Sequence, residues 1–201
     1  MMATTHALLG MVLALPVLAI APEFAPAAFL AGLAGGLAPD LDLYAGHRKT
    51  LHYPVYAALA AGPAAGLAVL VPSTPTVSLA VGLAAAAAHA AIDAAGGGLE
   101  LRPWLADSER AVYSHYHDRW IRPRRWVRYD GAPEDLALAG GAAAPLVVVA
   151  DGPVAGAALA LLAVSAVYVL LRKPLATVAE RLARAVPAGL HSYVPERYRG
   201  V

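Results

Sequence analysis

The sequence contains no cysteine, which excludes disulfides, thiolate zinc sites, iron–sulfur clusters and a cysteine nucleophile. Charged residues are also scarce: they make up 14% of the 201 residues, against about 25% in a typical soluble domain. Hydrophobic residues reach 59%, so an ordinary water-soluble globule and a disordered chain are both excluded. The formal net charge of +1 gives no overall field that would attract nucleic acid, and no nucleic-acid partner is expected.

Long stretches without any charge are the main feature that is present. The stretch Tyr53–Ile92 contains no Asp, Glu, Lys or Arg, and it is twice as long as the roughly 20 residues that one membrane span needs. The turn residues at 71–75 divide it into a helical hairpin. The same reading of the other apolar stretches predicts an all-α, polytopic membrane protein. Its six transmembrane helices are expected at about residues 4–21, 25–38, 52–71, 76–95, 134–150 and 153–171.

These helices form one expected integral-membrane domain over residues 1–174, which includes an interfacial loop at 96–133. An amphipathic cytoplasmic tail is expected to follow over residues 175–201. Pro16 is expected to kink the first helix. The GxxxG pairs Gly62 with Gly66 and Gly152 with Gly156 predict close contacts between helices.

The basic residues sort to one side of this arrangement. With six spans, all Lys and Arg residues fall in the 39–51 loop, the 96–133 loop and the C-terminal tail, whereas the opposite loops carry only Glu23 and Asp151. The positive-inside rule therefore predicts a multi-pass protein of the cytoplasmic (inner) membrane with both termini in the cytoplasm. A cleavable signal peptide is disfavoured because the first residues contain no Lys or Arg.

Histidine and aspartate residues gather at the predicted cytoplasmic ends of the helices. His89 and Asp93 are four residues apart, so they share one helix face and can reach one ion. Ionisable residues near a membrane are costly and usually mark function or a paired interior. The candidate metal ligands are His6, Asp40, Asp42, His47, His52, His89 and Asp93.

The types of ligand atom in this set limit which cofactors are expected. Imidazoles and carboxylates without sulfur suit a divalent metal, for which we expect zinc first, with manganese or iron as alternatives. Seven candidates exceed the needs of one ion, which leaves open two ions or one ion with a carboxylate base. Asp42 is the expected general base for water, and Arg48 is expected either to hold a substrate anion or to pair with the aspartates.

Four motifs in this order resemble a known family. They are Thr5-His6-x3-Gly10, Pro39-Asp40-x-Asp42, His47-Arg48-x-Thr50-x-His52 and His89-x3-Asp93. The set is similar to the YdjM/YbcI-type inner-membrane metal-dependent hydrolases, over about residues 1–105. The resemblance implies a hydrolase, and the family's distant similarity to zinc-dependent phospholipases C implies phosphoester or lipid-like substrates. Nothing functional is carried over to residues 106–201.

The loop and tail indicate contact with the lipid bilayer. Residues 106–135 mix arginines with tyrosines and tryptophans, a composition that suits anionic lipid headgroups. His115 and His117 are read as interfacial residues, with an extra ligand pair or a gate as the alternative. Residues 175–186 repeat apolar positions at Leu175, Val178 and Leu182, which predicts an amphipathic surface helix.

Two other functions remain open. A metal or proton transporter would use the same residue types, although transporters usually place ligands near the middle of the bilayer. A non-catalytic membrane scaffold could use them for a structural metal or for buried ion pairs. The sequence favours a hydrolase over a transporter because the candidate ligands lie near one end of the helices.

Overall fold

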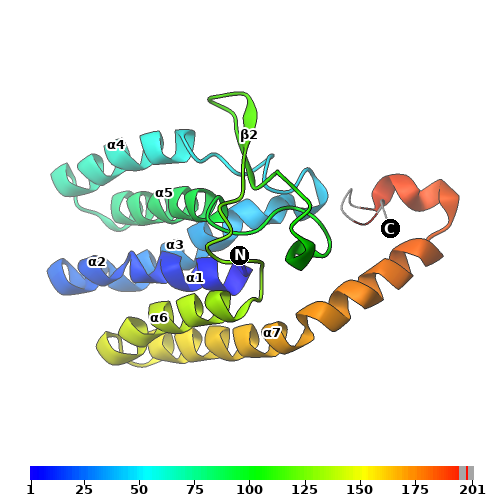
Figure 1. The fold of residues 1–201 in the computed structure, drawn as a ribbon. Coiled ribbons are helices and arrows are strands. Elements are labelled where there is room, and N and C mark those ends of the chain that lie inside the picture. Colours follow the sequence, from blue (N-terminus) through cyan, green and yellow to red (C-terminus); the bar gives the residue numbers. More distant parts are fainter. Residues whose placement is uncertain (195–197, 199–201) are drawn as a thin grey trace.

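The computed structural model describes residues 1–194 and residue 198. Seven α-helices and one small β-hairpin make up the regular structure of these residues, and Figure 1 shows most of the helices running alongside one another. The helices are α1 (Ala3–Val12), α2 (Leu15–Ile20), α3 (Ala25–Leu37), α4 (Tyr56–Leu70), α5 (Thr74–Asp93), α6 (Pro133–Val149) and α7 (Pro153–Ala185). The strands are β1 (Val112–Ser114) and β2 (Arg119–Ile121), which pair antiparallel.

The chain is an all-α membrane protein, but fewer helices meet the length of a span than the sequence predicts. Within the described residues, four segments are long and apolar enough to cross a membrane. They are Ala3–Ile20, Pro22–Tyr44, Thr74–Asp93 and Pro153–Ala185. The helices α4 and α6 lie where spans are predicted, but with 15 and 17 residues they are shorter. The membrane side of each terminus stays a prediction.

Two predicted helices are interrupted or extended for local reasons. The first divides into α1 and α2 after Val12, and Pro16 stands in the first turn of α2, where it needs no hydrogen-bonded N–H. The second, α3, continues without a break as the 3₁₀ helix η2 (Ala38–Tyr44). This continuation carries Asp40 and Asp42 beyond the end of the α-helix.

Glycines bring α1, α3 and α5 into close contact. A Cβ atom at Gly32 would overlap the carbonyl oxygen of Gly10, and one at Gly36 would overlap that of His6. Gly35 and Gly82 make the equivalent contact between α3 and α5. The predicted close contacts at other glycines are wrong, because a Cβ would meet nothing within 4 Å at Gly62, Gly66, Gly152 or Gly156.

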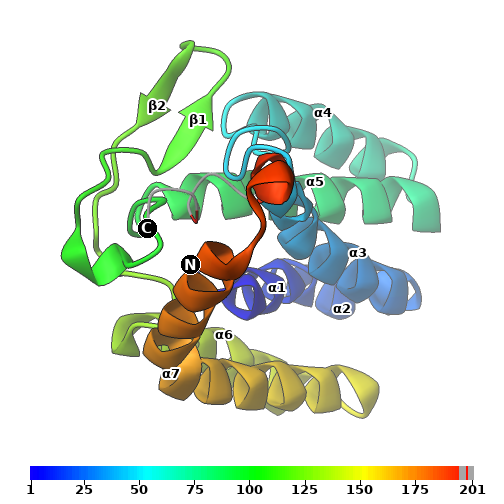
Figure 2. The same ribbon diagram turned by 90° about the vertical axis from the view of Figure 1, so that its right-hand side faces the viewer.

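The central helix of the bundle is α1, which packs against α3, α5, α6 and α7, while α4 packs on α5. Figure 2 shows α1 between α3 on one side and α6 and α7 on the other. The core around it includes Leu8, Phe29 and Leu146. The segment between α5 and α6, with its hairpin, covers one end of the bundle, and the N-terminus lies at that same end (Figure 1).

The last helix reaches well beyond the bundle. With 33 residues, α7 is about 50 Å long, whereas a hydrocarbon core measures about 30 Å. The predicted domain boundary at residues 174 and 175 lies within α7, so the predicted amphipathic segment continues the last span. Its apolar residues Leu175, Val178 and Leu182 are exposed. The predicted tail also includes residues 195–197 and 199–201, which lie outside the described residues.

Candidate metal centre

Four of the predicted ligands meet at the end of the bundle under the loop. Asp40 comes from η2, His52 from the segment before α4, and His89 and Asp93 from the last turns of α5. One ligand atom of each residue lies within 4.8 Å of the other three. His52, His89 and Asp93 are buried, whereas the Asp40 side chain is 23% exposed. The group could therefore hold one metal ion, which would be reached from the side of Asp40.

The separations of the four ligand atoms are those of a coordination shell. The Nε2 atoms of His52 and His89 are 3.1 Å apart, and Asp93 Oδ2 lies 3.3 and 3.5 Å from them. Asp40 Oδ1 lies 3.5 Å from His89 Nε2 and 3.9 Å from His52 Nε2. Zinc lies about 2.0–2.2 Å from nitrogen and oxygen ligands, so the edges of a tetrahedron around it measure roughly 3.3–3.6 Å. The observed separations bracket this range.

The outer nitrogens of the two imidazoles support the same interpretation. His89 Nδ1 lies 2.6 Å from the carbonyl oxygen of Gly36, and His52 Nδ1 lies 3.0 Å from Asp42 Oδ2. Both partners only accept hydrogen bonds, so each Nδ1 carries a proton and a neutral ring presents a lone pair at Nε2. Two lone pairs that face each other at 3.1 Å repel unless a proton or a metal ion lies between them. This arrangement of partners is typical of metal-bound histidine.

Asp42 lies behind His52 and does not reach the centre of the four ligands. Its Oδ2 also accepts a hydrogen bond from the backbone N–H of Leu51, and its Oδ1 lies 3.0 Å from His47 Nδ1. The backbone N–H of Arg48 donates to the same Oδ1. The Asp42 carboxylate is therefore occupied in shaping the loop that carries His47 and His52.

His6 also stands outside the four-residue group. Its ring stacks on that of His89, with centroids 3.6 Å apart, and its Nε2 lies 3.2 Å from Asp93 Oδ1. The other oxygen, Asp93 Oδ2, is buried and accepts no hydrogen bond within the described part of the chain. Hydrogen bonds thus hold Asp93 Oδ1, while Oδ2 faces the Nε2 atoms of His52 and His89.

Arg48 lies beside the four ligands with its charged group directed inward. Its backbone has a φ of 58°, in the left-handed region that residues other than glycine seldom adopt. Its Nη1 donates to the carbonyl oxygen of Gly97 at 2.8 Å, and its Nε lies 3.3 Å from Asp93 Oδ2. The hairpin supports this segment, because the backbone N–H of Tyr113 donates to the carbonyl oxygen of Arg48.

The other predicted histidines of the loop lie away from the four ligands. His115 stacks on Tyr53, and its Nε2 lies 2.7 Å from the carbonyl oxygen of Lys49. His117 Nδ1 contacts Ser114 Oγ at 2.9 Å. His115 thus helps to hold the hairpin against the segment that carries Arg48, whereas His117 makes its contact within the hairpin, and neither belongs to the four-residue group.

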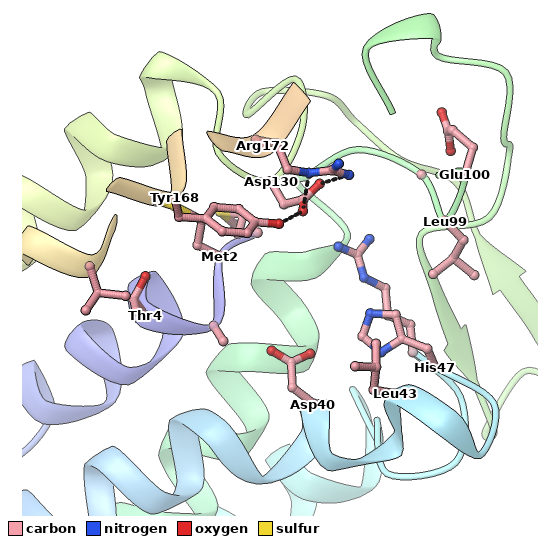
Figure 3. Close-up of a pocket in the computed structure, with 15 residues that line it drawn as sticks. Met2, Thr4, Asp40, Leu43, His47, Leu99, Glu100, Asp130, Tyr168 and Arg172 are labelled. Carbon is pink, nitrogen blue, oxygen red and sulfur yellow. Dashed lines mark hydrogen bonds and ion pairs between the residues drawn. The ribbon is translucent and has the colours of Figure 1, made fainter. Parts of the chain in front are cut away.

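A cavity of about 370 Å³ opens beside the four ligands. Asp40, His47 and Arg48 line one part of it. Figure 3 shows Asp130, Tyr168 and Arg172 in another part, where Arg172 binds Asp130 through two nitrogens, at 2.8 and 3.1 Å, and the Tyr168 hydroxyl donates to Asp130. Burial by itself would raise the pKa of the Asp130 carboxyl, but the Arg172 guanidinium outweighs burial and lowers that pKa below its usual range.

This second part of the cavity wall is absent from the predicted site. Tyr168 and Arg172 are four residues apart on α7, so they share a face, and that spacing was the available sequence clue. From the sequence, Arg172 served only as one of the basic residues that predict the membrane topology.

The comparisons with known proteins add no relative. No family model, no curated protein and no solved structure matches this chain. The arrangement of the four ligands and the adjoining cavity therefore carries the functional argument.

Proposed function

We propose that this chain is a membrane-bound, metal-dependent hydrolase that acts on phosphoesters at the cytoplasmic face of the inner membrane. The proposal agrees with the family resemblance in the four sequence motifs. The observation that carries it is the close approach of four ligand atoms, all within 4.8 Å of one another, beside a cavity. We further propose one ion, zinc before manganese or iron, because four of the seven candidates converge and the other three contact ligands or the loop.

The residues divide into distinct roles in this mechanism. His52, His89 and Asp93 would hold the ion, which would polarise the phosphoryl oxygen and make a nearby water more acidic. Asp40 lines the cavity and is placed to accept the proton of the attacking water. Arg48 would donate to the phosphoryl oxygens as negative charge develops on them. The water oxygen bonds to phosphorus, the bond to the leaving oxygen breaks, and the leaving group takes up a proton from solvent.

Metal content and activity of purified protein test this proposal. We expect stoichiometric metal in detergent-purified wild type and its loss in His89→Ala. The matched control is His191→Ala, which replaces an exposed histidine of the tail. Wild type should hydrolyse p-nitrophenyl phosphate or its diester, lose this activity on chelation, and recover it when zinc or manganese is added back. Metal-loaded wild type that hydrolyses neither compound would contradict the hydrolase.

A structural metal site is the alternative that a specific observation favours. Four protein ligands can complete the shell of zinc, and closed sites of this kind stabilise proteins without catalysis. The Asp40→Asn variant separates the two functions. A proton acceptor at Asp40 predicts retained metal with reduced kcat, whereas a purely structural ligand predicts reduced metal content and a lower melting temperature.

A further inference from the structure

Residues of the three helices α1, η2 and α7 line the cavity beside the metal ligands. Its residues include Thr4 of α1, Asp40 and Leu43 of η2, and Val164 and Tyr168 of α7. Figure 3 shows Thr4 on α1, to the left of both Tyr168 and Asp40. The Ser165 hydroxyl of α7 donates to Thr4 Oγ1 at 2.7 Å, which joins α7 to α1 at this point. The cavity therefore lies between η2 and α7, over the first turn of α1.

The cavity extends from the polar end of the bundle into the membrane-spanning part of α7. Arg172 is ion-paired with Asp130 of the loop at the polar end. Val164 precedes Arg172 by eight residues, which corresponds to about 12 Å along the helix. Val164 belongs to the candidate span Pro153–Ala185, and its side chain is 56% exposed. The cavity wall thus changes from charged to apolar toward the bilayer interior.

The two ends of the cavity suit the two parts of an amphiphile. Arg48 and Asp40, the proposed proton acceptor beside the metal ligands, lie at the polar end, where a phosphate group would be bound. Met2 and Val164 provide apolar surface along the rest. A volume of about 370 Å³ lies at the lower end of the range for small-molecule sites, so it accommodates a headgroup but not two acyl chains as well. The chains would remain in the bilayer.

We infer that the substrate is a membrane lipid with a phosphoester headgroup, which enters sideways from the bilayer between η2 and α7. This inference rests on the proposed hydrolase and names its class of substrate. The headgroup moves along the exposed Val164 surface toward Asp40 and Arg48. The water-soluble phosphoesters reach the same ligands from the polar end of the cavity, so the two kinds of substrate share the metal centre and differ in their path.

A bulky side chain at Val164 tests this path. Val164→Trp should obstruct the apolar part of the cavity and leave the metal ligands in place. Val167→Trp is the matched control, because Val167 is 55% exposed on the same helix and does not line the cavity. Each protein is reconstituted in phosphatidylcholine vesicles that contain phosphatidic acid. Diacylglycerol formation reports lipid cleavage, p-nitrophenyl phosphate reports soluble cleavage, and native mass spectrometry counts retained phosphatidic acid.

We expect Val164→Trp to lower lipid cleavage about tenfold or more and to reduce retained phosphatidic acid, and to lower soluble cleavage much less than lipid cleavage. Val167→Trp should resemble wild type in all three measurements. Equal effects of the two variants, or equal loss of lipid and soluble cleavage in Val164→Trp, would overturn sideways access. Soluble cleavage by wild type without lipid cleavage would also overturn it and would leave the hydrolase intact. Retained lipid that depends on Val164, without cleavage of either compound, would support the path and refute the hydrolase.

Discussion

Replacing Asp42 with asparagine distinguishes a partner of a metal ligand from a metal ligand. The Asp42 carboxylate accepts from His52 through Oδ2 and from the backbone of Arg48 through Oδ1. Asparagine keeps one acceptor oxygen, so at least one of these donors loses its partner. Loss of such an orienting contact typically weakens metal binding 10- to 100-fold, whereas loss of a direct ligand weakens it far more. We therefore expect Asp42→Asn to bind zinc about 10- to 100-fold more weakly and Asp93→Asn to lose it.

The size of the stability change follows from ligand linkage. At a free zinc concentration of about 100 times the wild-type Kd, binding stabilises the fold by about 2.7 kcal/mol. A Kd that is 10 or 100 times higher lowers this contribution to about 1.4 or 0.4 kcal/mol at the same zinc concentration. The contribution is measured as the difference between melting with zinc and melting with chelator, and Kd is measured by competition with a fluorescent chelator.

Asp135→Asn is the matched control for this experiment. Asp135 is also fully buried and also accepts several hydrogen bonds, including one from Thr5 and one from the backbone of Gly131, but it lies outside the four-residue group. We expect it to lower the melting temperature with and without zinc by the same amount. Wild-type zinc affinity in Asp42→Asn would refute the orienting role, and complete loss of zinc would make Asp42 a ligand.

Three further predictions concern packing, pH and topology. Gly32→Ala should destabilise the detergent-solubilised protein by about 1–3 kcal/mol, because the new Cβ would overlap the backbone of α1. Gly62→Ala should be neutral or slightly stabilising. Equal melting temperatures of the two variants would contradict this prediction. Folding lowers the pKa of Asp130, so the ionised carboxylate stabilises the folded protein. This stabilisation is fully present above the unfolded-state pKa, about 4. It is lost as the pH falls through the lower folded-state pKa. Asp130→Asn should weaken this acid dependence of the melting temperature. Because the chain lacks cysteine, single cysteines introduced as Asp151→Cys or Arg122→Cys report the membrane topology. In intact bacterial spheroplasts an impermeant maleimide should label Asp151→Cys but not Arg122→Cys. Labelling of Arg122→Cys would reverse the predicted orientation.

The sequence predicts best those features that depend on local periodicity. The apolar stretches locate all six predicted helices to within a few residues, except that the first is divided and the last is longer. His89 and Asp93 share a face of α5 because they are four residues apart, and both contribute to the four-residue group. Glycine contacts are harder to predict, since Gly62 and Gly32 both occur in GxxxG pairs. Gly32 is in close contact with α1 because α3 packs between α1 and α5. A Cβ at Gly62 would meet nothing within 4 Å.

Contacts between distant segments determine the rest of the site. His47 and His52 lie on the same short loop, and local periodicity does not distinguish them. The hairpin fixes this loop, because Tyr113 binds the backbone of Arg48 and His115 contacts that of Lys49. These contacts cross more than 60 residues of sequence. They direct His52 inward to the ligands of α5, whereas His47 remains at the cavity wall beside Asp42.

The different positions of Asp40 and Asp42 follow from the local backbone once η2 is known. A 3₁₀ helix has three residues per turn, so residues two apart point in directions about 120° apart. Asp40 and Asp42 therefore cannot both face the ion from η2. Asp40 turns toward the cavity and the α5 ligands, and Asp42 turns toward the loop that carries His52. Asp40 thus presents its carboxylate to the metal ligands and the cavity, whereas Asp42 binds the outer nitrogen of His52 and orients its ring. This division makes the Asp40→Asn and Asp42→Asn variants differ: the first should lower turnover at constant metal affinity, and the second should lower metal affinity first.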